Sequence, residues 1–135
     1  MATFNKINSF VEFLAEKRIN LGSDQLVVAL TNTAHTSTWD ELADLTQISY
    51  TNLSSRNITT STSSQTSGTY KLVLTDLVLT ASGAVGPFRY IYIYSDTSTN
   101  DDLIGYYDYG SSISLASGDT FTIDFDGTNG VLTIA

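Results

Sequence analysis

The sequence contains no cysteine, and it has a single histidine, His35, among its 135 residues. Without cysteine the chain cannot form disulfides, thiolate zinc sites or iron–sulfur clusters, and it has no thiol nucleophile. One imidazole also leaves little material for histidine metal sites or acid–base catalysis. The composition therefore favours a binding or structural module, and we expect no enzyme activity, no catalytic residue, no cofactor and no bound metal.

Positive charge is scarce as well, because six lysines and arginines stand against fourteen aspartates and glutamates, for a net charge of −8. Affinity for nucleic acid or anionic lipid comes from clustered Lys and Arg. The longest apolar stretches, such as Leu77 to Leu79 and Tyr90 to Tyr94, fall far short of a membrane helix. Neither nucleic acid nor membrane is an expected partner, and residues 1–17 are too rich in charge for a cleaved secretion signal.

The length predicts a single domain over residues 1–135, with an N-terminal helical arm at 1–22 and a β domain at 23–135. Apolar residues recur at helical spacing from Phe4 to Leu14, which predicts an amphipathic helix from about Phe4 to Lys17. A second, single-turn helix is expected at Trp39 to Asp44, because Thr38 and Glu41 have capping-box spacing.

The rest of the chain carries strand signals. The apolar run Leu26 to Leu30 predicts a strand, the Ser/Thr-rich segment Asn57 to Thr62 an edge strand, and Ser63 to Gly68 a mobile turn. A phase shift near Asp76 predicts a bend, and Gly110-Ser111 reads as a turn. Further strands are expected at Tyr70 to Leu74, Leu77 to Leu79, Phe88 to Tyr94, Leu103 to Tyr109, Ile113 to Leu115, Thr120 to Phe125 and Val131 to Ile134.

Eight or nine short strands at this spacing predict an all-β fold, mainly an antiparallel β-sandwich or jelly-roll-like, with one N-terminal α-helix; a small barrel is the other arrangement they fit. The residues expected in its core are apolar and fall on the inward phase of the helix or strands. They are Phe10, Leu14, Val28, Leu30, Leu72, Leu74, Ile91, Ile93, Ile104, Phe121, Ile123 and Leu132.

Tyrosines form the most unusual cluster, because three alternate along Tyr90 to Tyr94 and three more lie within Tyr106 to Tyr109. If the isoleucines between them face the core, the tyrosine row faces solvent or another chain. Tyrosine is enriched at interfaces, so we predict an interface; the alternative is a central strand covered on both faces, and glycan stacking is a third use. The expected interface residues are Tyr92, Tyr94, Tyr107 and Tyr109.

Calcium binding is a weaker possibility at the loop Asp96 to Asp102, which alternates oxygen-bearing residues. The EF-hand positions for glycine and the closing glutamate hold Asp101 and Tyr107 here, and no helices flank the loop. A solvated hairpin tip is the favoured interpretation. The segment from Asp124 through Asp126 to Asn129 is likewise interpreted as a turn.

Hydrolysis has little support in the sequence. His35 lies in a polar linker and is expected to be structural or exposed. The only glutamates, Glu12, Glu16 and Glu41, fall on predicted helical surface, where paired catalytic carboxylates are not expected. A small hydrolase remains the weakest of three hypotheses for the function.

Several segments of the sequence together carry a resemblance to a known family. They are Phe4-Asn5-Lys6, Ser9-Phe10-Val11, Leu26 to Thr33, Phe88-Arg89-Tyr90, Leu103 to Tyr106, Gly118 to Thr122 and Val131-Leu132. With these segments the chain resembles, over nearly its whole length, small virion proteins of tailed bacteriophages, the head decoration or cement proteins. The resemblance implies a β-rich phage structural protein on the capsid surface of the virion, assembled in the host cytoplasm. Its implied partners are the major capsid protein lattice and itself, as a homotrimer; a tail or fibre module that binds glycans is the alternative.

Overall fold

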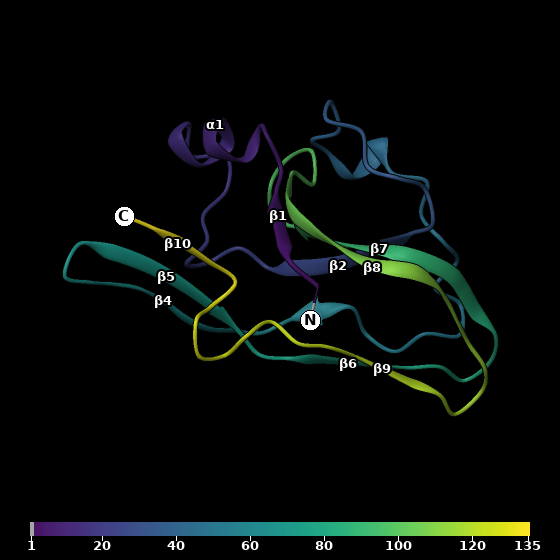
Figure 1. Cartoon of the computed structure of the whole chain (residues 1–135). Helices are drawn as coiled ribbons and strands as arrows, with labels where there is room; N and C mark the ends of the chain where they lie inside the picture. The colour runs from purple at the N-terminus through teal and green to yellow at the C-terminus, as the bar shows by residue number, and fades with distance from the viewer. Residues whose placement is uncertain (1) are drawn as a thin grey trace.

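Two long neighbouring strands, β7 (Val85–Ser95) and β8 (Leu103–Leu115), form the centre of the fold in this computed structural model, which describes residues 2–135. They belong to a five-stranded antiparallel sheet with the order β1-β8-β7-β2-β3 (Figure 1). The other members are β1 (Phe4–Lys6), β2 (Leu26–Thr31) and β3 (Asn57–Ile58).

Two smaller antiparallel sheets form a second layer beneath the first (Figure 1). One has the order β10-β5-β4, from β4 (Thr60–Thr66), β5 (Thr69–Leu74) and β10 (Leu132–Ile134). The other pairs β6 (Leu77–Thr80) with β9 (Thr120–Ile123). The prediction of a mainly antiparallel all-β fold with one N-terminal helix is confirmed, and the two layers form a sandwich-like arrangement.

The core lies between these layers because one face of the larger sheet is apolar. Ile91 and Ile93 pair with Leu30 and Val28 in register, so all four side chains share this face. Of the residues expected in the core, all but three are buried. The three exceptions pack against the core but are partly exposed, and they are Leu14, Phe121 and Leu132.

The N-terminal segment differs from the prediction. Residues Phe4–Lys6 form β1, which pairs with β8, and the helix α1 covers only Phe10–Ala15. Lys17 has a left-handed backbone, with φ of 66°, which ends the helix before the predicted boundary. The single helical turn expected at Trp39 to Asp44 is a shorter 3₁₀ turn at Leu42–Asp44, and its capping box is formed by Glu41 and Asp44 rather than by Thr38 and Glu41. Within residues 2–135, no helix has the length and apolar character needed to span a bilayer.

Two predicted turns are wrong. Strand β4 continues through Thr66, so only Ser67 and Gly68 remain of the turn expected at Ser63 to Gly68. Gly110-Ser111 lies inside β8, where the pairing with β7 shifts register. Glycine's left-handed φ of 95° at position 110 bends the strand without ending it. The bend expected near Asp76 is confirmed, because β5 ends at Leu74 and β6 begins at Leu77.

Candidate interaction surface

Most of the tyrosine row is buried within the chain. Tyr92, Tyr94 and Tyr107 are 0%, 4% and 7% exposed, whereas Tyr109 is 51% exposed. The expectation that the row faces solvent is therefore wrong for the first three. The alternative interpretation, a central strand covered on both faces, describes β7. Tyr109 is the one expected interface residue that is open to a partner.

A loop between β2 and β3, residues 32–56, covers the tyrosine face of β7. The Nδ1 atom of His35 lies 2.8 Å from the hydroxyl oxygen of Tyr92, and the His35 ring stacks on Tyr106 at 4.3 Å between centroids. Arg56 opposes the rise in the pKa of Tyr94 that burial causes. His35, expected to be structural or exposed, is a half-buried residue that holds this loop against the sheet.

Acid should weaken this contact. Burial lowers the pKa of His35 below its usual value near 6.5, so the folded state favours the neutral imidazole. The folded state then binds fewer protons than the unfolded state, and stability should decline as the pH falls from about 7 toward about 5.5. Urea unfolding across this range should show the decline in wild type and a flatter profile in His35→Gln. Equal slopes for the two proteins would contradict this role for His35.

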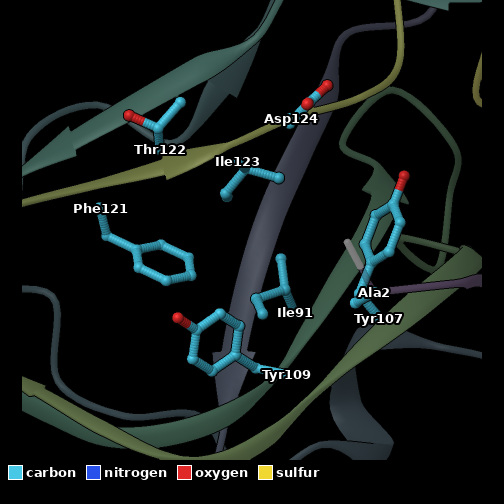
Figure 2. Close-up of a pocket in the computed structure, with 8 residues that line it drawn as sticks. All are labelled: Ala2, Ile91, Tyr107, Tyr109, Phe121, Thr122, Ile123 and Asp124. Carbon is cyan, nitrogen blue, oxygen red and sulfur yellow. The ribbon is translucent and has the colours of Figure 1, made fainter.

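Tyr109 borders an apolar hollow between the two layers (Figure 2). One wall comes from Ile91, Tyr107 and Tyr109 of the larger sheet, and the other from Phe121 and Ile123 of β9. The rings of Tyr109 and Phe121 meet edge to face at 5.5 Å between centroids. The hollow holds about 210 Å³, enough for one side chain of a partner.

Acidic groups lie at the rim of this hollow. Asp124 lines it, with one carboxylate oxygen accepting a hydrogen bond from the backbone N–H of Asp126 at 2.8 Å. Burial, with Asp124 and Asp126 nearby, raises the pKa of Tyr107 to about 12, so this hydroxyl keeps its proton at neutral pH. The site thus offers aromatic and apolar contact beside negative charge. This combination suits an apolar side chain or the apolar stem of a cationic one.

Polar groups of the loop Asp96 to Asp102 are hydrogen-bonded to other groups of the chain. The Asp102 backbone N–H donates to Ser98 Oγ at 2.8 Å, and Arg18 donates to both carboxylate oxygens of Asp102. Across residues 2–135, no group of three or more His, Cys, Asp or Glu side chains is placed to hold a metal ion.

The remaining sequence candidates are dispersed. Glu12 and Glu16 are exposed on or beside α1, and Glu41 caps the 3₁₀ turn, so the structure brings no two of them into one site. Asn129 donates two hydrogen bonds to the Asp126 carboxylate, which lowers the pKa of that group and closes the expected turn. The sequence predicted Phe121 only as a core residue and did not predict its contact with Tyr109. That contact between β8 and β9 forms only in the folded chain.

Comparison with known proteins gives no match, whether to a family model, a curated protein or a solved structure.

Proposed function

We propose that this protein is a virion structural protein of a tailed bacteriophage, which decorates and stabilises the capsid by binding the major capsid protein lattice. The resemblance of the chain to head decoration proteins supports this proposal. The observation that carries it is the half-exposed Tyr109 beside an apolar hollow with an acidic rim. Such a site gives a partner surface a rigid aromatic anchor and a pocket to fill.

Because the capsid repeats the same subunit many times, a small contact at each subunit would be sufficient for attachment. A capsid presents many identical copies of its subunit, and a homotrimer of this protein could engage three of them at once. Linking three weak contacts raises avidity by about 10² to 10⁴ when the geometry fits. The proposed partners are therefore the major capsid protein and two further copies of this chain, on the capsid surface.

Attachment should depend on the Tyr109 ring. We expect Tyr109→Ala to reduce co-sedimentation with undecorated capsids by at least about tenfold, because an anchor ring at an interface contributes about 2 kcal/mol. The fold should survive, since this side chain is half-exposed. Val78→Ala, at a 51% exposed position on the outer side of β6, is the control and should bind as wild type does. Equal co-sedimentation of both variants would refute the role of Tyr109.

Location distinguishes the two virion hypotheses. An exposed aromatic ring beside a carboxylate is also chemistry that glycan-binding modules use, so a tail or fibre module is the second candidate. Negative-stain images of virions that carry a gold label on this chain should show label over the head. Label confined to the tail would favour the fibre module.

Light scattering of the purified protein tests whether it forms a trimer, and a strict monomer at high micromolar concentration would count against the trimer.

A further inference from the structure

A second apolar surface lies between α1 and the β10 edge of the second layer. One hollow of about 560 Å³ is lined by α1, β1 and β10, and an adjoining hollow of about 360 Å³ continues along α1 toward Tyr70. The walls of the two hollows share Leu14 and Ile134, so the hollows adjoin, and we name them together the α1 groove. Figure 1 shows α1 above the β4–β5 hairpin and β10.

Exposed apolar side chains concentrate in this groove. Across residues 2–135, four large apolar side chains are exposed, and two of them, Val11 at 55% and Ile134 at 42%, line the groove from opposite sides. Leu14 between them is only half-buried. A partner that filled the groove would remove this apolar surface from water, which is a favourable contribution to binding.

Two strand edges also face the groove. Strand β1 ends the five-stranded sheet and β10 ends the three-stranded sheet, and both line the larger hollow. The backbone N–H of Ile7 donates to the Ile104 carbonyl at 3.0 Å, so the peptide groups of Asn5, two residues earlier, face β8 as well. Those of Phe4 and Lys6 consequently point away from β8. An extended segment in the groove can bond to them as an added strand.

The charged side chains that line the groove are lysines, in a protein that is otherwise acidic. Lys6 lines the larger hollow and Lys17 the adjoining one. In the described part of the chain the two salt bridges use Arg18 and Arg89, so neither lysine is paired with a carboxylate. Since the Debye length is about 8 Å at physiological ionic strength, the lysines that line the groove act on a bound ligand more strongly than carboxylates farther from it do.

We propose that the α1 groove binds an extended peptide segment of another protein, with apolar side chains at alternate positions and a carboxylate at each end. The apolar side chains fill the space between α1 and β10. The backbone of the segment bonds along β1, and its carboxylates pair with Lys6 and Lys17. This proposal is independent of the virion function, because it uses a different surface and a partner defined only by its chemistry.

The test uses a fluorescein-labelled octapeptide with valine at alternate positions and aspartate at both ends, titrated with the full-length protein in fluorescence polarisation. Val11→Lys should weaken binding at least tenfold, because it places a charge in the apolar groove at an exposed position that the fold tolerates. Lys6→Glu with Lys17→Glu should weaken it similarly. Val78→Lys, equally exposed but on β6, is the matched control and should leave binding unchanged. Thermal melting verifies that each variant is folded.

Three results would overturn the proposal. The first is no saturable binding of the octapeptide to wild type, or equal binding to Val11→Lys. The second is equal binding of an octapeptide with lysine at both ends, which would remove the charge argument. The third is a dimer in light scattering that Val11→Lys abolishes and that excludes the octapeptide, which would make a second copy of this chain the occupant.

Discussion

Ile93→Ala should lower the free energy of unfolding by about 2 to 5 kcal/mol, the usual cost of deleting a buried isoleucine side chain to alanine. Ile93 is 1% exposed at the centre of β7, and it is flanked by Val28 on β2 and Gly105 on β8. Because its neighbours belong to paired strands, the surrounding backbone cannot collapse far into the cavity. We therefore expect a value in the upper half of the range, measured by urea unfolding.

The matched control is Ile134→Ala, the same chemical change at a side chain that is 42% exposed on the short edge strand β10. Its expected cost is about 1 kcal/mol or less, since a large part of that side chain stays in water on folding and its removal leaves no enclosed cavity. Both variants should keep the wild-type dependence of the free energy on urea concentration. A loss below about half a kcal/mol for Ile93→Ala would mean that the assigned face of β7 is wrong.

Strand alternation predicted much of the fold because each strand signal is local. The period-2 pattern of β7 located Ile91 and Ile93 on the core face, and both are buried. The same reasoning failed at the N-terminus, where Phe4 and Ile7 fit a helical stripe. Pairing with β8 overrides that local preference, and Gly105 makes it possible: a Cβ at this position would collide with the Phe4 ring and lie 2.8 Å from the Asn5 carbonyl oxygen.

The candidate site was predicted only in part, for a related reason. Alternation shows that Tyr92 and Tyr94 share a face, but it cannot show whether another segment covers that face. The covering loop is polar and irregular, and His35 within it gave no sign of its contact with Tyr92. Tyr109 lies on the other face of the sheet, because Tyr107, two residues earlier, pairs with Ile91, and it is half-exposed at the edge of the hollow beside Phe121. Loop packing of this kind depends on tertiary structure, which periodicity does not encode.

The ion pair between Arg18 and Asp102 was also missed, because the residues are far apart in sequence. In the sequence, Arg18 directly follows the helix predicted from Phe4 to Lys17, and Asp102 ends the loop that was interpreted as a solvated hairpin tip. In the fold, Arg18 stacks over the Phe13 ring at 4.1 Å and donates to both Asp102 oxygens, at 2.6 and 3.2 Å. The pair thereby ties the segment after α1 to the β7–β8 connection.

Arg18→Met should lower the free energy of unfolding by about 3 kcal/mol. The Asp102 side chain is 1% exposed, so removal of its partner leaves a buried carboxylate without its two charged hydrogen bonds. The cost should fall at the low end of the range for buried pairs, because Arg18 itself is 37% exposed and solvent screens part of the interaction. Methionine keeps an unbranched apolar side chain but removes the guanidinium, so the loss includes its stacking over Phe13 as well as its hydrogen bonds to Asp102.

Arg89→Met provides the control within the same chain, because it breaks the one other salt bridge among residues 2–135. Arg89 and Asp108 are 38% and 37% exposed, and such surface pairs contribute about 0 to 1 kcal/mol. Urea unfolding of the two variants should therefore differ by about 2 kcal/mol. Addition of Asp102→Leu to Arg18→Met should recover part of the loss, because it removes the unpaired buried charge. Equal losses for the two arginine variants would show that Asp102 is hydrated in solution and that the pair does not fasten α1 to the sheet.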